Sequence, residues 1–291
     1  MSLRTLPAAP TARSADVRSN APDKALARWV PGLAPRQVAG DEAERSISIL
    51  DVIGEDFWLG EGVTSKRIGA ALRQIGERDV IVNVNSPGGD FFEGLAIYNM
   101  LREHPAKVTV RIVGLAASAA ATIAMAGDEV LIAKAGFMMV HETLWCACGH
   151  ADELREVASI MDTFDEVAVG IVADRAGMTV EEAGALLKGS GDGTWLSGKR
   201  AVELGLADGH LPADLAVAAA DDRPAQTAIR RISAALRRDG MSRGQERETI
   251  QQLKTAMQDA GPDGTQDAAV ERGLDRLLTK ARNMEGAQHA V

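Results

Sequence analysis

Between residues 46 and 211, apolar runs alternate with segments of helical periodicity. Runs rich in Val and Ile, which are typical of buried strands, occupy residues 46–54, 80–84, 106–118 and 128–142. Between and after them, apolar residues recur at helical spacing in segments 64–77, 91–104, 119–127, 151–177 and 179–189. Strands that alternate with helices predict βαβ units, and therefore an α/β fold with a mostly parallel sheet covered by helices.

Both ends of the chain lack this sustained pattern. Residues 1–45 are rich in Ala, Pro, Arg and Asp, which predicts a flexible leader. Residues 213–291 carry alternating charges and only short amphipathic stretches, such as Ile229, Ile232 and Leu236, which predicts a separate, partly helical tail. One ordered domain is therefore expected over residues 46–212.

The amino-acid composition disfavours several classes of function. The chain has 291 residues, 46% of them hydrophobic, which suffices for one sizeable core. A net charge of −9 and 3% aromatic residues disfavour nucleic-acid binding, which needs basic clusters and stacking platforms. No apolar stretch reaches the roughly 18 residues of a membrane span, and the N-terminus lacks a signal-peptide core. We therefore expect a soluble intracellular protein, without nucleic-acid or membrane partners.

Two cysteines, Cys146 and Cys148, are the only ones in the chain. Two thiols are too few for a structural zinc site unless His141 or His150 joins them. Ordinary reduced cysteines are the expected interpretation, and no metal is predicted.

Groups that suit acyl transfer fall at or just past the ends of predicted strands. In a parallel sheet these ends form the edge where ligands bind. Acyl transfer by serine needs a nucleophile, a base, an acid that orients the base, and oxyanion donors. The candidates are Ser118 as nucleophile, His141 as base, an acid near Asp192, and the backbone N–H groups of the Gly88-Gly89 turn. Taken singly, a serine among alanines also suits tight helix packing, and a lone histidine is more often structural.

Four segments in unbroken order resemble the ClpP-type serine peptidases, over about residues 46–211. They are "NVNSPGGDFFEGLAIYNML", "GLAASAAATIAMAG", "MMVHE" and "WLSGKRAVELGLAD". The resemblance implies a fold of repeated ββα units shared with the crotonases, with Ser118 as nucleophile and His141 as general base. It further implies an oxyanion hole formed by the N–H groups of Gly89 and Ala119, and no cofactor.

The sequence departs from the family pattern in two places. The family's acid lies two residues before the aromatic of the closing segment, and here that position is Gly193, before Trp195. Asp192 is one residue further away, and a glycine loop could carry its carboxylate to His141, so Asp192 is the expected acid. The segment after His141 has no proline and carries Trp145, which predicts an altered substrate groove.

The leader, the "WLGEGVTSKR" segment and the tail are similar to those of ClpP-like head maturation proteases of tailed bacteriophages and prophages. That resemblance implies an endopeptidase that cleaves scaffold, coat or portal proteins inside a precursor capsid, in the cytoplasm of the bacterial host. The charged, amphipathic tail suits reversible binding of coat protein, and the alternative is a degradable extension with no partner. The family also forms rings, so a homo-oligomer is expected, with the long helix at 152–176 joining rings face to face. An unfoldase partner stays open, because no segment identifies its docking pocket.

Four alternatives remain open. A housekeeping-type Clp proteolytic subunit would share the chemistry but not the role in capsids. A ring-forming scaffold protein would keep the fold with a lapsed site, and a crotonase-type acyl-CoA enzyme would use the oxyanion donors without the serine–histidine pair. A serine–lysine peptidase would use Lys134 or Lys199 in place of His141.

Overall fold

The computed structural model describes residues 21–30, 33–35, 40–54, 62–145, 147–190, 193–212, 216–218, 232, 236 and 248–252. The chain divides into two compact units, residues 1–222 and 223–291. Apart from 216–218, 232, 236 and 248–252, the predicted tail lies outside the described residues, and so do Asp192 and Cys146. The account below therefore concerns the first unit.

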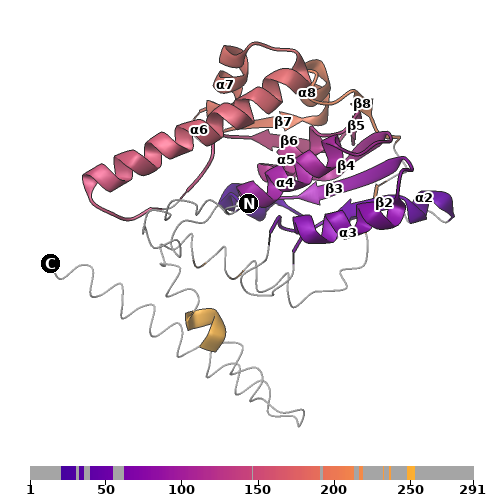
Figure 1. Ribbon diagram of the computed structural model, residues 1–291, viewed down its shortest axis with the longest axis horizontal. Helices are drawn as coiled ribbons and strands as arrows, with labels where there is room; N and C mark the ends of the chain where they lie inside the picture. The colour runs from indigo at the N-terminus through magenta and orange to yellow at the C-terminus, as the bar shows by residue number, and fades with distance from the viewer. Residues whose placement is uncertain are drawn as a thin grey trace, which may run out of the picture. The chain divides into compact units, whose positions relative to one another are not determined.

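A mostly parallel sheet forms the centre of this unit, which confirms the predicted α/β fold (Figure 1). Five parallel strands follow one another across it: β2 (Ser46–Ile49), β3 (Val80–Ser86), β4 (Val108–Ala117), β5 (Glu129–Ile132) and β8 (Gly209–His210). Two further strands branch from β4: β6 (Phe137–Val140) pairs with it in parallel, and β7 (Thr194–Ser197) pairs with β6 in antiparallel. Within the described part of this sheet, β6 and β7 form the one antiparallel pair. They lie beside the last residues of β4, at the end of the sheet that carries the site.

Besides an N-terminal helix described below, seven helices accompany this sheet within the described part of the unit. They are α2 (Asp41–Glu44), α3 (Ser65–Ile75), α4 (Phe91–Arg102), α5 (Ala119–Ala124), α6 (Ala151–Ala176), α7 (Val180–Lys188) and α8 (Gly198–Glu203). Their starts follow capping chemistry: the side chains of Thr64, Asp90 and Thr179 accept hydrogen bonds from the first turns of α3, α4 and α7. The first half of α6 projects beyond the sheet (Figure 1).

The apolar segment 128–142 forms two strands, where the sequence pattern predicts continuous strand. A tight turn, closed by the Gly136 N–H on the Ala133 carbonyl at 2.8 Å, separates β5 from β6. As a result, β4 pairs with β5 along its first half and with β6 along its last three residues. β7 lies outside the four strand segments that the sequence predicts, because four residues are too few for a clear period-two signal.

Alternation along β4 and β6 separates two apolar layers. Ala116, Met138 and Val140 belong to the main core, which lies under the helices. Leu115, Ala117 and Met139 belong to a second, smaller cluster. Because successive side chains of a strand point to opposite faces, the second cluster lies on the face away from α5.

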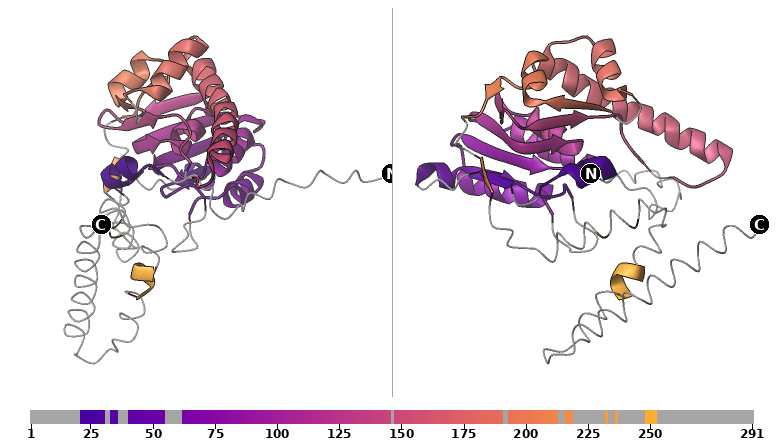
Figure 2. Two further views of the ribbon diagram at one scale, coloured as in Figure 1. Left: turned by 90° about the vertical axis from the view of Figure 1, so that its left-hand side faces the viewer. Right: turned by 180° about the vertical axis from the view of Figure 1, so that it is seen from behind.

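The N-terminal segment covers that second face, where the sequence predicted a flexible leader. Helix α1 (Asp23–Arg28) is followed by Trp29, whose 7% exposed side chain packs against Leu115, Ala117 and Met139. The view from behind shows α1 over the strands (Figure 2). The prediction of a leader without order is therefore wrong for the described residues before 46. The order comes from the apolar contact of one buried residue, Trp29, which a search for periodic apolar positions does not detect.

Hydrogen bonds fasten this segment to the sheet at Asn85, which is 1% exposed. The Trp29 indole N–H donates to the Asn85 carbonyl at 2.9 Å, and the Asn85 amide donates to the carbonyls of Val30 and Leu33 at 2.8 and 2.9 Å. A short strand, β1 (Leu33–Pro35), then pairs in antiparallel with β9 (Ala216–Ala218). The buried amide is thus hydrogen-bonded, as burial requires.

Among the helices that the structure describes, none combines the length and the apolar character needed to cross a membrane.

Candidate active site

Ser118 lies at the junction of β4 and α5 in a conformation that side chains rarely adopt. Its φ of 56° makes it the one residue other than glycine with positive φ in the described part of the chain. Such a backbone costs free energy and persists only where surrounding contacts hold it. Here the Ser118 N–H donates to the Met139 carbonyl at 2.8 Å, which ties the serine to the end of β6. The sharp turn exposes the hydroxyl at the carboxyl edge of the sheet.

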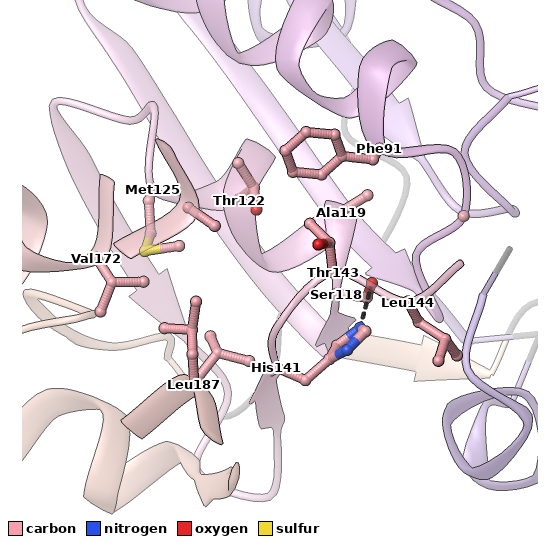
Figure 3. Close-up of a pocket in the computed structure, with 13 residues that line it drawn as sticks. Phe91, Ser118, Ala119, Thr122, Met125, His141, Thr143, Leu144, Val172 and Leu187 are labelled. Atoms are coloured by element: carbon pink, nitrogen blue, oxygen red, sulfur yellow. Dashed lines mark hydrogen bonds between the residues drawn. The ribbon is translucent and has the colours of Figure 1, made fainter. Parts of the chain in front are cut away.

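His141 follows β6 directly and meets this hydroxyl. The pairing of Ala117 with Met139 places the ends of the two strands side by side. The distance between His141 Nε2 and Ser118 Oγ is 2.7 Å, a hydrogen bond (Figure 3). The structure therefore brings together the two residues that the sequence proposed as nucleophile and base.

Burial lowers the pKa of His141 below its ordinary value of 6.5. The backbone of Glu142 and the negative charge of Asp165 act in the opposite direction, but burial has the larger effect. The imidazole is consequently neutral near pH 7, and a neutral imidazole nitrogen can accept a proton. This is the state that a general base needs before the reaction.

The glycine turn after β3 packs directly against the nucleophile. A Cβ on Gly88 would lie 2.5 Å from the Ala117 carbonyl oxygen and 2.7 Å from Ser118 Cβ, so only glycine fits. Gly89 is excluded from carrying a side chain by a different neighbour, because its Cβ would lie 2.8 Å from the backbone nitrogen of Ile53. The adjacent backbone of Ile53 therefore requires glycine at position 89.

A pocket opens beside the hydroxyl. Gly89, Ser118, Ala119 and His141 line it together, so the four residues proposed for nucleophile, base and oxyanion donors share one cavity (Figure 3). Most of its other walls are apolar, contributed by Phe91, Met125, Val140, Leu144, Ala168, Val172 and Leu187. Such a pocket suits an uncharged, apolar side chain.

The acid side of the site lies partly outside the described residues. Asp192 lies outside the described residues, so its position relative to His141 stays a prediction. Gly193 has a φ of 80°, and a Cβ there would lie 2.9 Å from His141 Cα and still closer to His141 Cβ and the Val140 carbonyl oxygen. The position where the family has its acid therefore has no room for any side chain in this chain.

Asp165, on α6, is a residue that the sequence did not single out. Its Oδ1 accepts hydrogen bonds from the Thr143 N–H at 2.6 Å and from Thr143 Oγ1 at 2.8 Å. Several acids occur along α6, and nothing in their spacing marks this one. Its partner Thr143 lines the pocket.

Aromatic rings gather beside the pocket, in the region where the sequence predicts an altered groove. The Trp145 and Phe164 ring centroids are 5.1 Å apart, and those of Phe92 and Phe164 are 5.2 Å apart. Phe92 and Leu144 are each about half exposed. Trp145 thus contributes to an apolar surface that connects the segment after His141 with α4 and α6.

Other candidate groups lie elsewhere. Neither Lys134 nor Lys199 lines the pocket. Lys199 instead forms an ion pair, with its Nζ 3.7 Å from Oε1 of Glu203. Cys148 is exposed, and the described residues hold no cluster of three or more His, Cys, Asp or Glu side chains that could bind a metal ion. The serine–lysine alternative therefore finds no support in the geometry.

A strained serine, hydrogen-bonded to a neutral histidine at the mouth of an apolar pocket, defines the class of site used by serine hydrolases. The model of the family described as Clp protease matches residues 64–211, just over half of the chain. The chain belongs to the Clp protease family, and its enzyme class is that of a serine peptidase.

Individual relatives agree with this family. The chain is 30% identical over 140 residues to the ATP-dependent Clp protease proteolytic subunit of Ligilactobacillus salivarius, covering 47% of this chain and 70% of the relative. It is 30% identical over 162 residues to the ATP-dependent Clp protease proteolytic subunit 1 of Prochlorococcus marinus, covering 52% and 81%. A solved structure of a ClpP1 mutant from Listeria monocytogenes is 19% identical to this chain. The alignment covers 58% of this chain and 91% of the Listeria chain, with a TM-score of 0.48.

Proposed function

We propose that this chain cleaves protein substrates as a ClpP-type serine endopeptidase, with Ser118 as nucleophile and His141 as general base. His141 Nε2 accepts the proton of Ser118 Oγ while the oxygen attacks the carbonyl carbon of the scissile peptide bond. The N–H groups of Gly89 and Ala119 bind the resulting oxyanion. His141 then returns the proton to the leaving amine, and water resolves the acyl-enzyme by the same route. Asp192 stays the predicted orienting acid.

The hydrogen bond of 2.7 Å between Ser118 Oγ and His141 Nε2 is the observation that carries this proposal. This hydrogen bond supports an active peptidase over a catalytically inactive scaffold protein. An inactive protein would have no need to keep the strained Ser118 and its partner His141. The hydrogen bond also disfavours the crotonase alternative, which needs no such pair.

The apolar pocket supports a preference among substrates. A side chain that enters it would contact Met125, Val172 and Leu187, which are themselves almost fully buried. Burial of apolar surface is favourable by about 25 cal/mol per Å². We therefore propose that the residue before the scissile bond is uncharged and apolar.

Cleavage of an unstructured protein tests this mechanism. The chain and its Ser118→Ala variant are incubated with a reduced, alkylated protein, and the new chain ends are mapped by mass spectrometry. Cuts by the unmodified chain that follow apolar residues, and their loss in the variant, are the expected result. Equal cutting by both forms would refute the role of Ser118.

For the biological role, we propose a head maturation protease of a tailed bacteriophage or prophage, acting as a homo-oligomeric ring on scaffold, coat or portal proteins. The segments on both sides of the matched region support it, because residues 213–291 have the charged, amphipathic character of a segment that binds coat protein reversibly. The exposed apolar residues Leu154, Ile160 and Val167 on α6 support contact between copies of the chain.

A second candidate is a housekeeping-type Clp proteolytic subunit, which the names of the relatives favour. The two roles differ in what they require. Deletion of residues 213–291 should leave peptide cleavage intact and reduce incorporation into particles when coat and scaffold proteins are co-expressed. Unchanged incorporation would favour the housekeeping role.

A further inference from the structure

Asp165 touches the segment that carries the base, yet the reaction as proposed above gives it no part. Its Oδ1 accepts both hydrogen bonds that Thr143 can donate, from the backbone N–H at 2.6 Å and from Oγ1 at 2.8 Å. Thr143 stands two residues after His141 and lines the same pocket. Hydrogen bonds to an ionised acceptor are stronger than those between neutral groups. The pair therefore ties the chain after the histidine to the long helix α6.

This tie matters because the described residues between β6 and α6 belong to neither a helix nor a strand. The strand ends at Val140, and the next helix begins only at Ala151. His141 is held by β6 on one side, and on the other side Thr143 is anchored at Asp165. Without this anchor, only β6, the packing of the imidazole and the contact with Ser118 would hold His141 in place.

Asp165 is also the source of negative charge that acts on His141 within the described part of the chain. Its charge raises the pKa of His141, against the larger lowering by burial. Apart from His141 itself, the residues that line the pocket have no ionisable acidic or basic side chain, and Asp165 stands outside that lining. On the side of β7, Gly193 has no room for a side chain. A carboxylate near the imidazole favours its protonated form.

We propose that Asp165 is a positioning residue for His141, which holds the backbone after the histidine through Thr143 and stabilises the imidazolium that forms when Ser118 gives up its proton. The proton moves from Ser118 Oγ to His141 Nε2, and Asp165 stays ionised throughout. The inference rests on the proposed function, because it assigns Asp165 to that same site.

Two substitutions separate the hydrogen bonds from the charge. Asp165→Asn keeps an oxygen that can accept from Thr143 and removes the charge, whereas Asp165→Ala removes both. Glu166→Gln is the matched control, since Glu166 is exposed, next to Asp165 on α6, and outside the pocket. Thr143→Val and Thr143→Ser test the other partner, because only serine keeps the donating hydroxyl.

The rate of Ser118 labelling by a fluorophosphonate measures activation of the serine without knowledge of the natural substrate. Intact-protein mass spectrometry follows this rate from about pH 5 to about pH 8. Labelling needs neutral His141, so the midpoint of its acid limb reports the pKa of that residue. Thermal unfolding of each variant, followed by circular dichroism, identifies any loss of fold.

Asp165→Asn is expected to slow labelling and to move the acid midpoint to lower pH, because the charge that raises the pKa of His141 is gone. Asp165→Ala is expected to label about 10²-fold more slowly, the cost of a small misplacement of a catalytic group. Thr143→Val should label more slowly than Thr143→Ser, and Glu166→Gln should match the unmodified chain. A structural role alone would leave the midpoint where it is.

Unchanged rate and midpoint in both Asp165 variants would overturn the inference while leaving the proposed function intact. A midpoint that moves in Asp192→Asn but not in Asp165→Asn would overturn it as well. If Asp165→Ala loses its fold, the midpoint of the isosteric Asp165→Asn variant decides. Absence of labelling in the unmodified chain would instead overturn the proposed function, and this inference with it.

Discussion

The two sides of the site are built in different ways. On the nucleophile side, Ser118 and His141 stand at the ends of two paired parallel strands, and the Gly88-Gly89 turn closes over them. On the acid side, β7 begins after Gly193, which has a positive φ. The described carboxylate whose charge acts on His141 is Asp165, which belongs to helix α6. Hydrogen-bonded strands fix positions far more tightly than a loop does. The nucleophile side can therefore keep its geometry while the acid side changes.

Ser118→Ala breaks the nucleophile side and should have the largest effect. Removal of the attacking oxygen is expected to lower kcat for peptide cleavage by about 10³-fold or more, with little change in KM. Because the small residue fits the same turn, the fold should persist, which circular dichroism can verify. Activity within about tenfold of the unmodified chain would mean that another group attacks the substrate.

Gly193→Asp breaks the acid side by supplying the family's acid at its family position. The new Cβ would collide with His141 and with the Val140 carbonyl, and the residue would have to adopt a φ of 80°. We expect kcat/KM to fall about 10²-fold, since displaced His141 no longer meets Ser118.

Alanine substitutions serve as controls for that variant. Gly193→Ala should also lose activity, because the Cβ alone causes the collision. Gly170→Ala should retain activity, because a Cβ there meets no atom within 4 Å. A gain of activity in Gly193→Asp would show that the loop before β7 can rearrange to accept the acid.

Trp29→Ala asks how far the nucleophile side depends on the N-terminal segment behind it. Trp29 packs against Ala117, which directly precedes the nucleophile. Truncation of a buried tryptophan should lower the free energy of unfolding by about 3–5 kcal/mol, as measured by urea denaturation. Trp29→Phe keeps most of the contact and loses the hydrogen bond to Asn85, at a cost of about 1 kcal/mol.

Phe137→Ala is the control for this loss, because its side chain is 47% exposed. Its effect on the free energy of unfolding should be smaller than that of Trp29→Ala. Equal effects would mean that the N-terminal segment adds no specific stability to the sheet.

The smallest expected effect is the pH dependence of activity in the unmodified chain, which tests the protonation state of His141 on the nucleophile side. Activity requires neutral His141, whose pKa burial lowers below 6.5. Activity should therefore persist as the pH falls through 6.5 and be lost only as it passes the lowered pKa. A profile of kcat/KM with an acid midpoint at or above 6.5 would contradict a buried, neutral base.

The sequence predicted the parallel sheet well, because buried strands and amphipathic helices leave strong periodic signals. Ser118, His141, Gly89 and Ala119 could be named in advance, since the ends of parallel strands converge and the family resemblance covers them. The break between β5 and β6 was not predicted, because both strands are apolar and the turn between them is short.

Contacts between distant segments could not be predicted. Trp29 reaches Met139 across more than one hundred residues, and neither position has a pattern that reveals the other. Asp165 likewise meets Thr143 only because α6 packs beside the segment after His141. Such pairs depend on tertiary packing, which local periodicity does not encode.

Labelling of the assembled chain with a fluorophosphonate, followed by peptide mapping, tests most directly whether His141 activates Ser118. We predict a single adduct on Ser118 in the unmodified chain, greatly reduced when His141 is replaced by Gln. An adduct elsewhere, or one on Ser118 that forms equally fast without His141, would contradict the account.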